Sequence, residues 1–258
     1  MRVTFVGVGE AFDEELANTS LLVEGSGALG PRTVLCDCGF TAGAAFFGCE
    51  ALPEMLREHG PDAVWISHFH GDHYFGLPYV LTRWHEQGRY RPLTVYGGPG
   101  IEEKLPALVD MAYPNVREKL GFALEAVTVG AGESFSLAGF AAHTAATGHG
   151  ALCLALRLET ADGAVYYGGD GAPTDACREA ARGCRLLVQE AYGVEAGVPG
   201  HGSVAQALAL AREARAETLA VVHVRREVRR EQGEAIRRML AESGLRARMP
   251  EPGDVWDS

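Results

Sequence analysis

The chain has 258 residues, of which 47% are hydrophobic and 22% charged, and its formal net charge at pH 7 is −11. This length can bury a sizeable core, and this composition is that of a globular protein, which excludes the disordered and fibrous classes. No apolar run approaches the roughly 18 residues of a membrane span. The acidic Glu10 comes too early for a signal peptide, so we expect a cytoplasmic protein that contacts no membrane.

Short apolar segments, each ended by glycine, asparagine or proline, predict strands near the start of the chain, at residues 3–8, 20–24, 33–37 and 63–67. A helix is expected at about 51–58, and 3.6-residue periodicity predicts helices at 76–86 and 99–111. A strand-rich block follows over 124–169. After it, helices at 173–182, 203–214 and 227–243 alternate with strands at 185–190 and 218–223. Each half therefore opens with strands and closes with helices, which predicts two sheets packed face to face with helices outside.

A dense cluster of metal-binding residue types directly follows the fourth predicted strand. His68, His70, Asp72 and His73 lie within six residues. In an extended segment, residues two apart point the same way, so His68 and His70 can both face one metal ion. Gly71 lets the backbone turn, which directs Asp72 and His73 toward a second point nearby. Imidazole nitrogen and carboxylate oxygen bind Zn²⁺ and similar divalent ions, so this segment predicts a metal site.

Three more ligand-type residues lie next to other predicted strands. His149 precedes an apolar strand, Asp170 follows the end of another, and His223 ends a third. Ligands at successive strand ends would gather along one edge of a sheet, where binding and catalytic residues concentrate. These residues are therefore candidates to complete the metal site.

The segment His68-Phe69-His70-Gly71-Asp72-His73 has the pattern HxHxDH and resembles the metallo-β-lactamase superfamily, in particular its ribonuclease Z branch. Further segments similar to that branch are spread over nearly the whole chain, at 4–9, 18–20, 37–39, 72–78, 149–157, 169–170, 187–191, 200–203 and 222–223. The resemblance implies an α+β protein with one domain over residues 1–258. It also implies a four-layer αββα sandwich (the metallo-β-lactamase fold) with two metal ions at one edge.

The resemblance further implies which residues bind the two divalent ions. His68, His70 and His149 would hold the first ion. Asp72, His73 and His223 would hold the second, and Asp170 would bridge both. His143 competes with His149 for its position, and the spacing from His149 to Arg157 favours His149. Zinc is the expected ion, with manganese or iron as alternatives.

The chemistry follows from the two ions. Ions about 3.5–4 Å apart can share a water molecule and lower its pKa toward neutrality, which gives a hydroxide nucleophile. They also stabilise the negative charge that develops on a phosphoryl or carbonyl oxygen. Asp72 could orient the nucleophile. By the resemblance, His201 donates a proton to the leaving alkoxide and Glu190 orients His201. We therefore predict a dinuclear phosphodiesterase with Asp72, His201 and Glu190 as catalytic residues.

Two features separate this chain from the ribonuclease Z enzymes that process tRNA. In the common bacterial arrangement, their tRNA-gripping arm lies between the third and fourth motifs, where this chain has only the 21 positions from His149 to Asp170. The net charge of −11 also disfavours tight binding of a large polyanion such as tRNA. The expected substrate is therefore a small phosphodiester or a short RNA. Arg225 and Arg226, just after His223, are candidates for binding its phosphate.

Two other classes of function stay open. A hydrolase of a lactone, β-lactam or thioester needs the same metals but no phosphate contact. An apolar pocket around the aromatic residues Phe69, Tyr74, Phe75 and Tyr79 would favour it. The other class is a non-hydrolytic member that uses iron for redox chemistry, or a binding protein with a structural metal. The ribonuclease Z resemblance also implies a homodimer.

Overall fold

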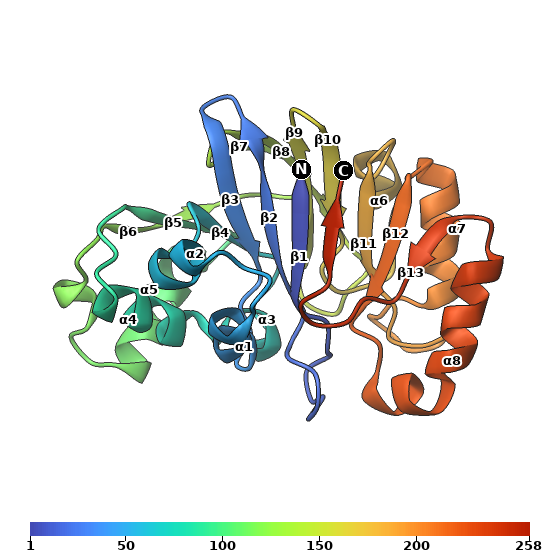
Figure 1. The fold of residues 1–258 in the computed structure, drawn as a ribbon, viewed down its shortest axis with the longest axis horizontal. Coiled ribbons are helices and arrows are strands. Elements are labelled where there is room, and N and C mark those ends of the chain that lie inside the picture. Colours follow the sequence, from blue (N-terminus) through green and yellow to red (C-terminus); the bar gives the residue numbers. More distant parts are fainter.

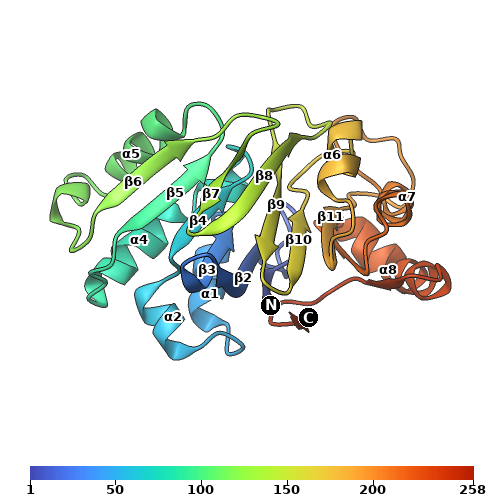
Figure 2. The ribbon, with the colours of Figure 1, turned by 90° about the horizontal axis from the view of Figure 1, so that it is seen from above.

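The computed structural model describes all 258 residues and contains two seven-stranded sheets that face each other, with helices against both outer faces (Figure 1, Figure 2). The strand order is β14-β1-β2-β3-β4-β5-β6 in the first sheet and β13-β12-β11-β10-β9-β8-β7 in the second. The four layers are those of an αββα sandwich, so the predicted α+β fold class is confirmed.

The N-terminal half of the chain builds the first sheet, and the last strand completes it. Four of its strands pair antiparallel: β14 (Val255–Asp257), β1 (Arg2–Gly7), β2 (Ser20–Gly27) and β3 (Gly30–Cys36). Three more continue in parallel with β3: β4 (Ala63–Ile66), β5 (Leu93–Gly97) and β6 (Leu124–Thr128). Parallel neighbours need crossover connections, and these carry α1 (Ala42–Gly48), α2 (Glu54–His59), α3 (Gly71–Tyr74), α4 (Leu77–Glu86) and α5 (Ile101–Ala112). A short 3₁₀ turn, Arg117–Lys119, precedes β6.

The C-terminal half repeats this plan in the second sheet. Four strands pair antiparallel: β7 (Ser134–Leu137), β8 (Phe140–Ala146), β9 (Leu154–Thr160) and β10 (Gly163–Tyr167). Three more continue in parallel with β10: β11 (Leu186–Glu190), β12 (Thr218–Val222) and β13 (Arg246–Arg248). Their connections carry α6 (Asp175–Ala180), α7 (Val204–Ala214) and α8 (Arg226–Glu242). In each sheet, the carboxyl ends of the parallel strands therefore lie at one edge.

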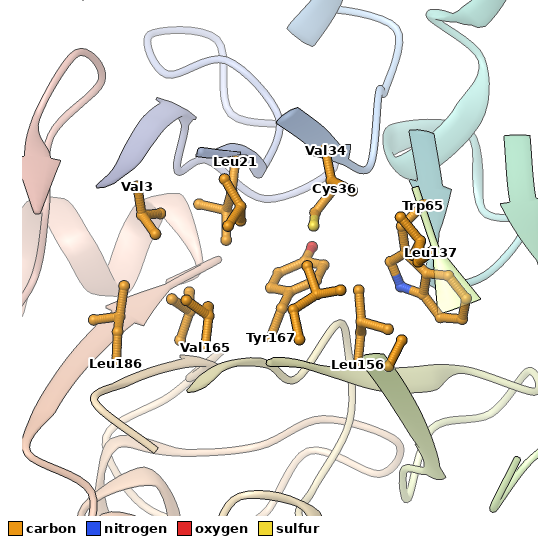
Figure 3. Packing of buried hydrophobic residues seen from close by; sticks show 14 of the residues in the cluster. Val3, Leu21, Val34, Cys36, Trp65, Leu137, Leu156, Val165, Tyr167 and Leu186 are labelled. Carbon is orange, nitrogen blue, oxygen red and sulfur yellow. The ribbon is translucent and has the colours of Figure 1, made fainter. Parts of the chain in front are cut away.

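Three hydrophobic clusters of nearly equal size, with 22, 22 and 21 buried residues, fill the spaces between the four layers. The central cluster lies between the sheets, where Val3 and Leu21 of the first sheet face Val165 and Leu186 of the second (Figure 3). A parallel strand in such a sandwich is covered on both faces, and all four residues of β4 are buried. This double covering explains why the central strands are continuous apolar runs in the sequence.

The sequence did not predict α1 or β5. The segment of α1 contains two glycines, which disfavour a helix, and no side chain caps its first turn. It is stabilised by packing instead, because the rings of Phe46 and Phe47 lie against Trp84 of α4. β5 has only five residues and is stabilised by pairing with β4 on one side and β6 on the other. None of the helices combines the length and apolar character needed to cross a bilayer.

Candidate metal centre

The predicted ligands meet at the edge of the sandwich where the parallel strands end. They come from four connections: His68, His70, Asp72 and His73 after β4, His149 between β8 and β9, Asp170 after β10, and His223 after β12. Asp72 and His223 are 151 positions apart in the sequence, yet Oδ2 of Asp72 lies 3.2 Å from Nε2 of His223. The two sheets bring these side chains together because their strands end at a shared edge.

The first group of potential ligands consists of His68, His70 and His149. One ligand atom of each lies within 4.8 Å of the others. Nε2 of His149 is 3.2 Å from Nδ1 of His70, and Nδ1 of His149 donates to the carbonyl oxygen of Gly200 at 2.6 Å. That hydrogen bond fixes the tautomer of His149 and turns its Nε2 toward the other two histidines.

The second group consists of Asp72, His73, Asp170 and His223, all of them buried. Nε2 of His73 lies 3.2 Å from Oδ2 of Asp72 and 3.3 Å from Oδ1 of Asp170. Oδ1 of Asp170 is also 3.5 Å from Nε2 of His223, while its Oδ2 is 4.0 Å from Nε2 of His68. Asp170 therefore lies between the two groups, with one oxygen toward each.

Two glycines set the position of Asp170. Gly169 and Gly171 have φ angles of 60° and 110°, in the left-handed region that disfavours other residues. A Cβ atom on Gly171 would lie 2.8 Å from the backbone nitrogen of His149. The chain therefore turns sharply after β10 and passes close to the His149 segment, which brings Asp170 against the first group.

The chemistry of these side chains fits divalent metal ions. Nε2 of His68 and Nε2 of His73 are buried, and neither has a hydrogen-bond partner. A buried polar atom without a partner costs about 1–3 kcal/mol, which a metal ion bound at these atoms would offset. Imidazole nitrogens and carboxylate oxygens are also the donors that such ions prefer.

Asp37, which sequence reasoning did not single out as a site residue, hydrogen-bonds to the ring nitrogen of His73 that faces away from the other candidate ligands. Its carboxylate is fully buried at the end of β3 and accepts four hydrogen bonds. Oδ2 accepts from Nδ1 of His73 at 2.7 Å, from the Ser67 hydroxyl at 2.7 Å and from the Tyr167 hydroxyl at 2.6 Å, while Oδ1 accepts from the Ser67 amide at 2.7 Å. The proton on Nδ1 leaves Nε2 of His73 available to a metal ion. The signal in the sequence was an acidic residue at the end of an apolar predicted strand.

The carboxylates and imidazoles of the site shift one another's pKa. Burial alone would raise the pKa of Asp72, but the hydrogen bond with His223 and the adjacent imidazole of His73 hold it well below its usual value. Burial would likewise lower the pKa of His223, but the charge of Asp170 and the hydrogen bond with Asp72 raise it to about 9. Burial, followed by the charge of His73, keeps the pKa of His68 well below its usual value. Asp72 and Asp170 are therefore ionised at neutral pH, as metal binding requires, whereas His223 would release a proton on binding an ion.

Glu190 and His201 form a hydrogen-bonded pair beside the ligands. Nδ1 of His201 bonds to Oε1 of the fully buried Glu190, whose Oε2 accepts from the amides of Gly171 and Gly202. The hydrogen bond with Glu190 raises the pKa of His201, against the opposing effect of burial. The ring of Tyr192 stacks on His201, with 4.4 Å between centroids. One ring nitrogen of His201 lies within 4.8 Å of ligand atoms of His149 and Asp170, so the imidazole faces the metal centre.

The two arginines predicted to bind phosphate make other contacts. Arg226 pairs with the buried Glu10 at 2.6 Å and with Glu227 at 3.0 Å, and Arg225 pairs with Glu227 at 2.8 Å. Neither arginine lines the cavity at the metal centre. Both guanidinium groups are thus engaged by acidic side chains next to the site.

The remaining histidines lie away from the cluster. His143 is in β8, where its Nδ1 is 2.9 Å from the Ser134 hydroxyl, and His59 and His85 belong to α2 and α4. The structure thus places His149, and not His143, beside His68 and His70.

A cavity of about 360 Å³ opens onto the ligands, and its lining comprises Glu10, Ala11, Phe12, Phe40, His70, Gly71, Asp72, Asp170, Tyr192, His201 and His223. The aromatic residues predicted for an apolar pocket, Phe69, Tyr74, Phe75 and Tyr79, are not among these residues. A larger groove of about 840 Å³ lies around Arg2, Glu24 and Asp62, but it contains none of the ligands. The chemistry therefore belongs to the smaller cavity.

Comparisons with known proteins agree with this geometry. Residues 32–224 match the family model described as the beta-lactamase superfamily domain. Ribonuclease BN of Escherichia coli O6:K15:H31 is 32% identical over 219 residues, which cover 63% of this chain and 70% of the relative. Ribonuclease BN of Erwinia tasmaniensis is 25% identical over 279 residues, which cover 87% of this chain and 89% of the relative.

Solved structures share the fold at lower identity. The human short-form tRNase Z superposes with a TM-score of 0.78 and 19% identity, covering 100% of this chain and 99% of that one. The metallo-β-lactamase fold protein YhfI from Bacillus subtilis gives 0.76 and 20%, covering 99% of both chains. A diphosphatase from the PhnP family gives 0.72 and 18%, covering 100% of this chain and 97% of that one.

Proposed function

The chain belongs to the beta-lactamase superfamily and is ribonuclease Z-like, and we propose that it is a dinuclear phosphodiesterase that hydrolyses a small phosphodiester or a short RNA. The observation that carries the proposal is the position of Asp170. Its two oxygens lie toward two separate groups of ligands, at 3.3 Å from His73 and 4.0 Å from His68. Such a shared carboxylate suits two metal ions a few ångströms apart, and not one.

His68, His70 and His149 would hold one ion, Asp72, His73 and His223 the other, and Asp170 would contact both. Bound there, two divalent ions supply a nucleophile at neutral pH and stabilise negative charge on the phosphoryl oxygens. The histidine-rich set favours zinc, with manganese or iron as alternatives.

The pair formed by His201 and Glu190 supports a role in proton transfer. Glu190 fixes Nδ1 of His201, so that the second ring nitrogen is left for the substrate. Because the pKa of His201 is raised, the imidazolium is better populated near neutral pH, as a proton donor to a leaving alkoxide requires. The position of Asp72, 3.2 Å from both His73 and His223, supports a role in orienting the nucleophile as well as in binding metal.

One observation favours a second candidate, the hydrolysis of a lactone, β-lactam or thioester. The cavity is lined by the apolar or aromatic residues Ala11, Phe12, Phe40 and Tyr192, and no lysine or arginine is among its lining residues. A neutral ester would therefore meet no unpaired cation there, and the same metal centre could polarise its carbonyl group.

Hydrolysis of bis(4-nitrophenyl) phosphate by protein reconstituted with zinc or manganese separates the two candidates. We expect metal-dependent release of 4-nitrophenolate that is lost in the variant His70→Ala. The variant His85→Ala is the matched control, because His85 lies on α4 outside the cluster. Fully metallated protein that hydrolyses lactones or thioesters but no phosphodiester would contradict the phosphodiesterase and support the second candidate.

A further inference from the structure

Two aromatic side chains that line the cavity at the metal centre are exposed to solvent. The side chains of Phe12 and Phe40 are 73% and 49% exposed, and both line the cavity that contains Asp72, Asp170 and His223. Leaving large apolar side chains exposed forgoes the free energy of burying them, and exposed apolar groups beside a catalytic cavity mark a binding surface.

The loop that carries Phe12 is fixed by an ion pair whose carboxylate is buried. Glu10 is 1% exposed, its Oε1 accepts from Arg226 at 2.6 Å, and its Oε2 accepts from the backbone amide of Phe12 at 3.0 Å. The backbone oxygen of Glu10 also accepts from Nδ2 of Asn18 at 3.2 Å. The exposed ring is thus attached to an ordered backbone, which lowers the entropy cost of binding a ligand against it.

The charge of the cavity limits what the rings can contact. The charged residues of its lining other than histidine are Glu10, Asp72 and Asp170, of which Glu10 is paired with Arg226 and the two aspartates belong to the metal centre. A substrate can therefore place one phosphate at the metals, but a second phosphate would find no lysine or arginine among the lining residues. The volume of about 360 Å³ suits a group of the size of one nucleoside rather than a longer chain.

We propose that the cavity takes the phosphodiester of a single nucleoside, with the phosphate at the metal centre and the planar base against Phe12 and Phe40. Aromatic rings bind any base through its face, so the preference is for a nucleoside over a small alkyl group and not for one base. This inference rests on the proposed phosphodiesterase function and names its substrate class.

The same geometry gives Arg226 a positioning role. The Arg226 guanidinium donates to Oε1 of Glu10, and Oε2 of Glu10 accepts from the Phe12 amide. Arg226 therefore affects substrate binding indirectly, by positioning the loop that carries Phe12. Removing Arg226 would leave the buried Glu10 carboxylate without its cation and would loosen the backbone at Phe12.

Two esters with the same leaving group test the proposal. The 4-nitrophenyl ester of thymidine 5′-phosphate and 4-nitrophenyl methyl phosphate both release 4-nitrophenolate on addition of water, and they differ in the nucleoside alone. For the zinc-reconstituted protein, we expect kcat/KM to be at least about tenfold higher for the nucleoside ester. In Phe12→Ala the ratio of kcat/KM for the nucleoside ester to that for the methyl ester should fall toward one, mainly because KM for the nucleoside ester rises. Phe12→Trp should keep the wild-type ratio. Tyr90→Ala is the matched control, because Tyr90 is 76% exposed and lines the separate larger groove.

The outcomes are distinguishable from failure of the proposed function. If neither ester is hydrolysed, the phosphodiesterase itself is contradicted. If both are hydrolysed and Phe12→Ala and Phe40→Ala leave the preference unchanged, the base-binding role is overturned and the phosphodiesterase stands. The role is also overturned if Phe12→Ala converts a dimer to a monomer in sedimentation with no change in preference, because the ring then belongs to an interface.

The positioning role of Arg226 has its own readout. Arg226→Ala should raise KM for the nucleoside ester more than for the methyl ester, and Arg226→Lys should partly restore the difference. An equal rise in KM for both esters would overturn the positioning role and point to direct contact with the phosphate.

Discussion

Replacing Asp37 by asparagine tests whether its hydrogen bond to Nδ1 of His73 positions this candidate metal ligand. An asparagine can keep its oxygen toward His73, Ser67 and Tyr167, but its amide nitrogen then faces the Ser67 backbone amide, which loses its acceptor. One buried donor without a partner costs about 1–3 kcal/mol, and the three remaining bonds lose the strength that the charge gave them, so we expect a loss of on the order of 3 kcal/mol in the free energy of unfolding.

The effect on metal binding is the sharper part of this prediction. Asparagine supports the orientation of His73 less strongly than a carboxylate, and losses of this kind lower metal affinity about 10- to 100-fold. Competition with a chromogenic zinc chelator measures the affinity, and urea unfolding of the metal-free variant measures the stability.

Asp62→Asn provides the matched control. Asp62 also bonds to β3, accepting from the Thr33 amide at 2.8 Å, but it lies in the groove away from the ligands. The Asp62→Asn variant should have a lower free energy of unfolding than the wild type but the same affinity for zinc. An Asp37→Asn variant that binds zinc within about twofold of wild type would refute the positioning of His73 by Asp37.

Three further predictions follow from the same structure. His201→Ala should lower kcat/KM about 10²- to 10⁴-fold for a phosphodiester with an alkoxide leaving group but far less for one that releases 4-nitrophenolate, which needs no proton; equal losses for both would contradict a proton donor. Chelation should lower the melting temperature by about 10 °C relative to protein in zinc at 1,000 times its dissociation constant, as calorimetry can check, and an unchanged transition would contradict a metal that bridges both sheets. Burial, and the nearby Asp257, raise the pKa of Glu24 despite Arg2, so that the native state takes up its proton more readily than the unfolded chain. Stability therefore rises as pH falls through the raised pKa, and Glu24→Gln should stabilise the protein at pH 8 with an effect that disappears below pH 4; a destabilised variant at pH 8 would contradict this sign.

The sequence predicted much of the fold because apolar runs mark the covered strands. The parallel strands β4, β11 and β12 are buried on both faces or nearly so, and each was expected from its composition alone. α1 and β5 were missed because tertiary packing and strand pairing stabilise them more than local preference does.

The metal centre was predictable for a geometric reason. Candidate ligands within six residues, as at His68 and His73, can be recognised by their spacing, and candidate ligands at strand ends, such as Asp170 and His223, are brought together by any sheet of parallel strands. Asp37 was harder to recognise as functional because its partners, Ser67, His73 and Tyr167, are known only once the two sheets face each other.

The arginines near the site show what spacing cannot reveal. Two arginines directly after a candidate metal ligand predict a phosphate contact, and in the structure Arg225 pairs with Glu227, two residues further on, while Arg226 pairs with Glu10 from a distant segment. Two arginines of α8 also pair with an acidic residue outside the helix, because Arg229 and Arg237 both bind Glu251, at 2.7 and 2.8 Å. Charge patterns in a sequence identify cations but not the anions that fold against them.

Zinc titration of chelator-treated protein, with hydrolysis of bis(4-nitrophenyl) phosphate followed at each addition, tests the dinuclear phosphodiesterase most directly. The two ligand groups that share Asp170 predict that turnover appears as the second equivalent of zinc binds, and that His70→Ala stays inactive at two equivalents. Full activity at one equivalent, or none when both sites are filled, would contradict it.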